Sequence, residues 1–224
     1  MIRQGLRLLT TAATQITHGK CGTSYTINGA LYLALTNKAN SKTLLETRGP
    51  GFTMPDSFQP LRDDEPTAAE LASIVDDHYE NLKIIGMGEN DPGVSFAGFG
   101  EPTQRIETLL KTVELVKERR HGVPFRLVTN GLCPPEVAGM LFSAGVKSAS
   151  VALMAANPVQ YAKLMDPTTP YGHADVCAFI VALSEAGIST ECTAVKSPGV
   201  NIKEVQQLAE ALGSVSFRAR DYFE

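Results

Sequence analysis

The chain has 224 residues, of which 43% are apolar and 20% are charged, and its formal net charge is −4. This is the composition of a soluble globular protein with a sizeable core. The acidic balance argues against a nucleic-acid partner, and no run approaches the ~20 apolar residues of a membrane span.

We expect residues 1–29 to be an N-terminal extension to the domain. This segment contains no acidic residue, since the first in the chain is Glu46. Apolar residues recur in it at helical spacing, at Ile2, Leu6, Leu9, Ala13 and Ile16. Two interpretations remain open. The segment is a transit-like helix for mitochondrial or other organellar import, or a short helix that covers an open end of a cytoplasmic domain. Both place the protein inside the cell, and cleavage of residues 1–20 is left open.

The Asn28-Gly29 turn predicts that Tyr25–Ile27 folds back as a hairpin. From residue 30 onward short apolar strands alternate with helical patterns, and we expect residues 30–224 to be one domain. The predicted strands are Leu31–Thr36, Val94–Ala97, Phe125–Thr129, Ala149–Leu153, Thr190–Val195 and Ser214–Arg218. The predicted helices are Ala68–Leu82, Arg105–Glu118, Pro135–Ser143, Pro158–Met165, Ala174–Ala186 and Ile202–Leu212.

Strand–helix alternation predicts an α/β fold of parallel strands joined by right-handed crossovers. Six units give an open doubly wound sheet or a partial barrel, and both place the functional face at the carboxyl ends of the strands. Several helix ends are marked in the sequence. Thr67 and Glu70 predict a capping box, Pro135 suits the first position of a helix, and C-cap glycines are expected at Gly145, Gly187 and Gly213.

The four cysteines, Cys21, Cys133, Cys177 and Cys192, contain no pair at metal-ligand spacing. We therefore expect them to be ordinary thiols of a reducing compartment. The segment from Arg48 to Pro66 is too long for a simple connection. This segment is predicted to be either a lid over the functional face at the carboxyl ends of the strands or a docking surface.

Polar side chains follow the predicted strands. After the second strand, Gly98 and Gly100 allow the backbone to approach a ligand, and the Glu101 carboxylate suits an ammonium group. Alternatively, Glu101 begins the next helix, where a negative charge is favourable. After the third strand, Asn130 and Gly131 predict a sharp turn, and Asn130 offers a donor and an acceptor at the functional face.

Two further candidates come later in the chain. Asn157 is expected to cap the helix that follows it. Arg218 and Arg220 share a strand face, where they either grip an anion or pair with acidic helices.

Taken together and in this order, these motifs resemble the radical S-adenosylmethionine superfamily, and within it the small group found beside TatD-type nucleases. The motifs are Gly98-Phe-Gly-Glu-Pro-Thr, Thr129-Asn-Gly, the Asn157-Pro helix and the Arg218-Ala-Arg strand. The resemblance implies a six-unit (β/α) partial TIM barrel. It implies that Gly98, Gly100 and Glu101 hold the ammonium of S-adenosylmethionine. Thr129 and Asn130 would face the cofactor, Asn157 would lie near the ribose, and Arg218 and Arg220 would line the adenine side.

The resemblance also implies a Cys-x3-Cys-x2-Cys loop that binds a [4Fe–4S] cluster. Ala39, Thr43 and Glu46 stand at those positions, with the spacing preserved. Since clusters are held by thiolates, we expect the cluster to be absent. Glu46 is a hard donor suited to other metals, and Cys133 and Cys21 do not rebuild a three-thiolate set.

Three hypotheses follow from this loss. The first is a cluster-free pseudoenzyme, a ligand-binding or assembly module for a nucleoside, an amino acid or a protein partner, with a pocket like that for S-adenosylmethionine. The second is an enzyme with non-radical chemistry that uses Glu46, Glu101, Asn130 and Arg220. The third is an active radical enzyme that binds its cluster through unusual ligands.

Overall fold

The computed structural model describes residues 22–54, 58–62, 64–83 and 91–224. Seven strands form one sheet in the order of the chain: β1 (Ser24–Ile27), β2 (Ala30–Leu33), β3 (Val94–Phe96), β4 (Phe125–Thr129), β5 (Val146–Ala152), β6 (Ser189–Val195) and β7 (Ser216–Arg220). Strands β1 and β2 are antiparallel, and every later neighbour is parallel. This is the predicted partial barrel, with the hairpin at its first edge.

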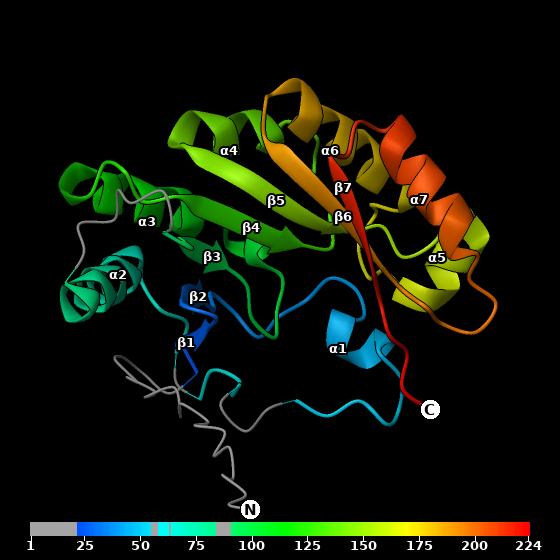
Figure 1. Cartoon of the computed structure of the whole chain (residues 1–224), viewed down its shortest axis with the longest axis horizontal. Coiled ribbons are helices and arrows are strands. Elements are labelled where there is room, and N and C mark those ends of the chain that lie inside the picture. The colour runs from blue at the N-terminus through cyan, green and yellow to red at the C-terminus, as the bar shows by residue number, and fades with distance from the viewer. Residues whose placement is uncertain (1–21, 55–57, 63, 84–90) are drawn as a thin grey trace, which may run out of the picture.

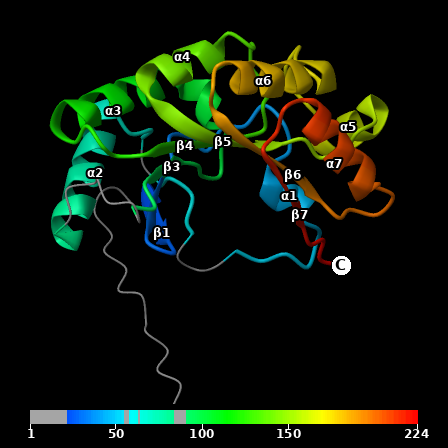
Figure 2. The same ribbon diagram turned by 45° about the horizontal axis from the view of Figure 1, so that its top comes forward.

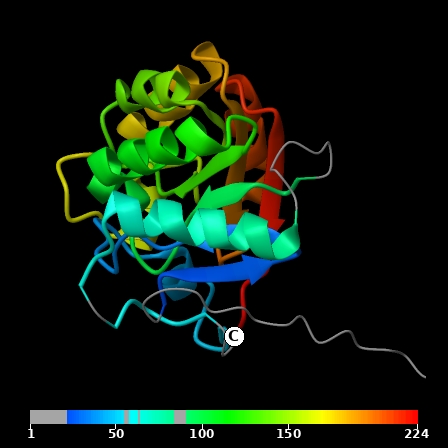
Figure 3. The same cartoon turned by 90° about the vertical axis from the view of Figure 1, so that its left-hand side faces the viewer.

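Helices occupy the crossovers: α1 (Leu44–Thr47), α2 (Ala68–Leu82), the 3-10 helix η1 (Pro102–Arg105), α3 (Ile106–Arg119), α4 (Val137–Ala144), α5 (Pro158–Met165), α6 (His173–Glu185) and α7 (Ile202–Ala211). Helices α2 to α7 lie along the outer side of the curved sheet (Figures 1 and 3). The short helix α1 lies instead on the inner side, beside the end of β7, in both Figure 1 and Figure 2.

The two faces of the sheet differ in polarity because successive side chains of a strand point to opposite faces. On β4, Phe125 and Leu127 are fully buried in the core, whereas Arg126 between them is only partly buried. The core is formed by the outer face of the sheet and the helices over it, with Leu33, Phe96, Val151, Phe179 and Leu183 among its buried members. The inner face is left for a cavity lined by polar and apolar side chains.

Three strands differ from their predicted bounds by two residues or more at one end or both. Strand β2 ends at Leu33 rather than Thr36, because the chain turns inward there to begin the loop that ends at α1. Strand β5 begins at Val146 directly after Gly145, and β7 runs two residues past Arg218. The longer end of β7 matters for the site, because it makes Arg220 a strand residue on the same face as Arg218.

The capping signals are mostly confirmed. Thr67 and Glu70 form the predicted capping box, and Gly145, Gly187 and Gly213 have positive φ at helix ends. The prediction for Pro135 is wrong: α4 begins at Val137, two residues later.

The N-terminal stripe and Cys21 lie outside the described residues. Within the described parts of the chain, no helix combines the length and apolar character needed to cross a membrane.

We predict that Thr67→Ala lowers the free energy of unfolding by about 1 kcal/mol, because the backbone N–H of Glu70 loses its side-chain acceptor at the start of α2. Urea titration followed by circular dichroism measures this. Thr67→Ser keeps the hydroxyl and is the control, expected to remain close to the wild type. An equal loss in both variants would contradict the capping role.

Candidate functional site

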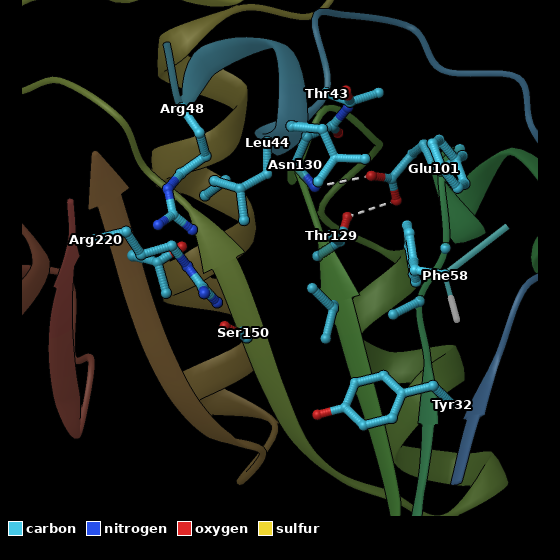
Figure 4. A pocket seen from close by; sticks show the side chains of 18 of the residues that line it. Tyr32, Thr43, Leu44, Arg48, Phe58, Glu101, Thr129, Asn130, Ser150 and Arg220 are labelled. Atoms are coloured by element: carbon cyan, nitrogen blue, oxygen red, sulfur yellow. Dashed lines mark hydrogen bonds between the residues drawn. The ribbon is translucent and has the colours of Figure 1, made fainter. Parts of the chain in front are cut away.

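A cavity of about 620 Å³ opens on the inner face of the barrel, at the carboxyl ends of the strands (Figure 4). Side chains from every part of the sheet and from the loop before α1 reach it. Its lining includes Tyr32, Ala39, Thr43, Arg48, Phe58, Gly98, Gly100, Glu101, Arg126, Thr129, Asn130, Ser150, Thr193, Arg218 and Arg220. Seven of the eight predicted cofactor-binding residues are therefore brought to one cavity.

Asn157 is the exception. Its side chain accepts hydrogen bonds from the backbone N–H groups of Val159 and Gln160 at the start of α5. It does not line the cavity. The predicted cap is present, and the structure gives Asn157 no contact with the cavity.

The Glu101 carboxylate is buried at one end of the cavity, with only 4% of the residue exposed. Its Oε1 accepts from the Thr103 N–H and hydroxyl and from the Thr129 hydroxyl, at 2.7–3.1 Å. Its Oε2 accepts from the Asn130 N–H at 2.8 Å. Burial raises the pKa of Glu101, and the hydrogen bonds from Thr129, Asn130 and Thr103 oppose that shift.

The two oxygens are unequally engaged, because a carboxylate offers about four acceptor sites. Oε1 has three donors and Oε2 has one. Oε2 therefore keeps acceptor capacity for one more donor, such as the ammonium group of a ligand.

The side chain of Asn130 joins β4 to the loop that follows β2. Its amide nitrogen donates to Asn40 Oδ1 at 2.7 Å and to the Ser41 hydroxyl at 3.0 Å. Its own oxygen accepts from the backbone N–H of Leu132. The Asn130 side chain therefore holds the loop in place. This structural role is an alternative to the predicted role of Asn130 in binding a cofactor.

The two glycines of the Gly98-Phe-Gly motif are required by the chain itself. A Cβ on Gly98 would lie 2.7 Å from the Ala34 Cβ, and one on Gly100 would lie 2.5 Å from the Thr36 carbonyl oxygen. The Gly100 N–H donates to that same oxygen. Both residues line the cavity, but close packing against the end of β2 already explains why they are glycine.

Positions 39, 43 and 46, which the resemblance matched to cluster cysteines, are spread around α1. Ala39 and Thr43 line the cavity, whereas Glu46 does not. Thr43 is the N-cap of α1, and Glu46 is the third residue of that helix. The Glu46 Oε2 accepts from the Thr43 N–H at 2.6 Å and from its hydroxyl at 2.8 Å, which completes a capping box.

These residues do not fit an iron–sulfur cluster, because none supplies a thiolate. Cys133 is a thiol close enough to Glu101 to feel its charge, but it is 4% exposed and does not line the cavity. Burial, and secondarily Glu101, raises the pKa of Cys133 well above its usual range. Within the described residues no group of three His, Cys, Asp or Glu side chains is arranged to hold a metal ion.

Arg48 and Arg220 lie across the cavity from Glu101 (Figure 4), and Arg126 and Arg218 also line it. Arg126 and Arg218 both donate to Glu191 Oε1, at 3.0 and 2.6 Å. The alternative that Arg218 pairs with an acidic helix is wrong, because its ion-pair partner Glu191 lies on the neighbouring strand β6. Among the residues that the structure describes, no acidic side chain is bonded to Arg220.

Sequence reasoning missed three residues of the cavity lining. Arg48 follows α1, Arg126 lies within β4, and Tyr32 lies within β2. The two strand residues could have been found, because each alternates with buried apolar neighbours on a predicted strand. Arg48 could not, since α1 is too short to give a periodic signal.

No family model matches the sequence, and no curated protein sequence matches it. Solved structures do match the fold. SuiB of Streptococcus suis, bound to its precursor peptide SuiA, superposes with a TM-score of 0.64 and 15% identity, over 90% of this chain and 41% of SuiB. The protein anSMEcpe with bound AdoMet matches with a TM-score of 0.61 and 14% identity, over 87% of this chain and 52% of that one.

A third match is TsrM of Kitasatospora setae, described as a radical S-adenosylmethionine methyltransferase, with a TM-score of 0.53 and 19% identity over 85% of this chain and 35% of TsrM. The chain spans only about a third to a half of these proteins. At these identities the likeness establishes the fold: the chain has the partial-barrel fold found in radical S-adenosylmethionine enzymes.

We predict that Gly100→Ala lowers the free energy of unfolding by about 1–3 kcal/mol or more, because its Cβ would press on backbone atoms that cannot move freely. Gly139→Ala is the control: a Cβ there meets nothing within 4 Å, and alanine favours the helix α4. Chemical denaturation of both variants measures the difference. A Gly100→Ala protein as stable as the Gly139→Ala protein would contradict the packing role of Gly100.

Proposed function

We propose that the chain is a ligand-binding module on a radical S-adenosylmethionine-type barrel that works without an iron–sulfur cluster. The Thr43–Glu46 capping box carries the proposal. It uses two of the three positions matched to cluster cysteines to begin a helix, and the third, Ala39, has no donor atom. The loop is thus built from hydrogen bonds where its relatives would need metal.

The finer resemblance belongs to the same proposal. The Gly98-Phe-Gly-Glu-Pro sequence supports a relation to the TatD-associated group, with Phe99 inserted as that group tolerates. Loss of the cluster removes the electron source for radical chemistry. The remaining function is therefore binding, of a small molecule in the cavity or of a protein partner through it.

The Glu101 end of the cavity supports an amine-bearing ligand, such as an amino acid or S-adenosylmethionine itself. The neighbours SuiB and anSMEcpe have each been solved with S-adenosylmethionine bound. In this chain, Glu101 Oε2 accepts one hydrogen bond and can accept another from the amino group of such a ligand. An ammonium there would form a charge-assisted hydrogen bond in a buried setting.

The cluster is tested by anaerobic reconstitution with iron and sulfide, followed by absorbance and iron analysis. We expect no stoichiometric cluster in the natural chain. The matched variant restores cysteine at all three positions (Ala39→Cys, Thr43→Cys, Glu46→Cys) and is expected to gain cluster absorbance. Four irons per natural chain would contradict the proposal and would favour an active radical enzyme with unusual ligands.

Binding at the Glu101 end is tested by calorimetric titration with S-adenosylmethionine. If an ammonium reaches Oε2, Glu101→Gln should weaken binding by about 1–3 kcal/mol, because the charge-assisted hydrogen bond is lost. Glu107→Gln, which changes an exposed residue of α3, is the control and should bind as the wild type does. Equal binding by the wild type and folded Glu101→Gln would exclude this carboxylate as the ammonium site.

A further inference from the structure

Arg220 is a cation without a counter-ion. No hydrogen bond or ion pair within the described residues engages its guanidinium, and its Nε is buried without a partner. The residue as a whole is partly buried, but buried polar atoms normally have a hydrogen-bond partner. An acceptor atom of a ligand at this end of the cavity would supply the partner that the Arg220 Nε lacks.

The acid that attracts Arg220 already pairs with two other arginines. Glu191 is close enough to attract Arg220, but its Oε1 already accepts from Arg126, Ser150 and Arg218. Two arginines thus share one carboxylate before Arg220 is considered.

Arg48 is a second cation beside Arg220, and the charge of Asp221 attracts it. Its Nε donates to the backbone carbonyl of Asp221, and its guanidinium lies over the rings of Phe52 and Phe223. The Asp221 carboxylate is bonded instead to Lys196, at 2.7 Å. In Figure 4 the Arg48 guanidinium points toward the Arg220 side chain, and the Arg220 guanidinium extends toward Ser150.

The two arginines therefore repel each other. Burial first, and then the charges of Arg218 and Arg48, lower the pKa of Arg220 to about 10, although Glu191 acts in the opposite direction. Both groups stay cationic near neutral pH. An anion between them would satisfy the unused donors and remove the repulsion, and the fork of a guanidinium matches carboxylate and phosphate oxygens.

The rest of the lining indicates what the anion is attached to. Four aromatic side chains form a continuous cluster at the β1–β2 side of the cavity: Tyr25 stacks on Tyr32 with ring centroids 5.0 Å apart, and Phe58 contacts Tyr25 at 4.5 Å and Phe99 at 4.6 Å. All four line the cavity. Such a surface suits a planar or apolar body.

We infer that Arg48 and Arg220 form an anion-binding end of this cavity, and that its ligand is a small organic anion with a carboxylate or a phosphate monoester on an aromatic body. This inference rests on the proposed function in taking the cavity to be a binding pocket. It does not depend on the absence of a cluster or on binding of an ammonium at Glu101.

The experiment uses the full chain as purified and three probes: phenyl phosphate, benzoate and inorganic phosphate. Calorimetry at low, matched ionic strength should give 1:1 binding of phenyl phosphate or benzoate, and the tighter of the two identifies the anionic group. Inorganic phosphate, which lacks the ring, should bind more weakly than phenyl phosphate. Benzyl alcohol, which has the ring without the charge, should not bind measurably.

Variants localise the binding. Arg220→Gln and Arg48→Gln should each raise Kd at least tenfold, whereas Arg62→Gln, an exposed arginine outside the cavity, should leave it unchanged. If Arg220→Gln does not fold, the Kd of Arg48→Gln is compared with that of Arg62→Gln instead. Absence of binding by every anionic probe, or equal weakening in Arg62→Gln and the two cavity variants, would overturn the inference.

A second readout separates a binding role from a structural one. Without ligand and at low salt, Arg220→Gln should melt at the same temperature as the wild type or higher, because an unpaired charge has been removed. Arg218→Gln, on the same strand and face, loses an ion pair with Glu191 and should melt no higher than the wild type. A lower melting temperature for Arg220→Gln than for Arg218→Gln would show that Arg220 is structural and would contradict the inference.

Discussion

The loop between β2 and α1 is held in place by hydrogen bonds from distant parts of the chain, and the geometry of the cavity depends on them. Asn37 exchanges two hydrogen bonds with the backbone of Leu61, at 2.8 and 3.0 Å. Asn40 and Ser41 are bonded to Asn130 at the end of β4. The Thr43–Glu46 capping box then begins α1. The loop thus has a defined structure built from the chain's own donors and acceptors.

The cavity that this loop helps to enclose has two electrostatically distinct ends. At one end the Glu101 carboxylate is satisfied by four hydrogen bonds and keeps one acceptor site. At the other end, Arg48 and Arg220 present donors that the described chain does not use, although neighbouring Arg126 and Arg218 share Glu191 as an ion-pair partner. This excess of positive charge suits a ligand of opposite charge.

Much of the fold could be predicted from the sequence, because strand–helix alternation and the capping residues are local signals. The Thr67–Glu70 box, the Asn157 cap and the parallel sheet are all present as predicted. The predicted start of α4 at Pro135 was wrong. Proline is accommodated both in the first turn of a helix and just before it, and here α4 begins two residues later, at Val137.

The site was only partly predictable, for reasons of distance along the chain. The resemblance brought Glu101, Thr129 and Arg220 to one cavity, but hydrogen bonds such as Asn40 to Asn130 join residues 90 positions apart. Nor does the sequence reveal that Gly98 and Gly100 are needed for packing against the end of β2. The role of Glu46 as a helix-capping residue required the position of Thr43 in space, since α1 has only four residues.

The central claim is that the loop before α1 folds without metal. Hydrogen–deuterium exchange on protein purified in the presence of a strong chelator tests it most directly, at the amides of Glu46 and Thr47, which are bonded to the Thr43 hydroxyl and carbonyl. The account predicts that both amides are protected in the chelator-treated chain and that added iron and sulfide leave the protection unchanged. Unprotected amides that become protected only when iron and sulfide are supplied would contradict it.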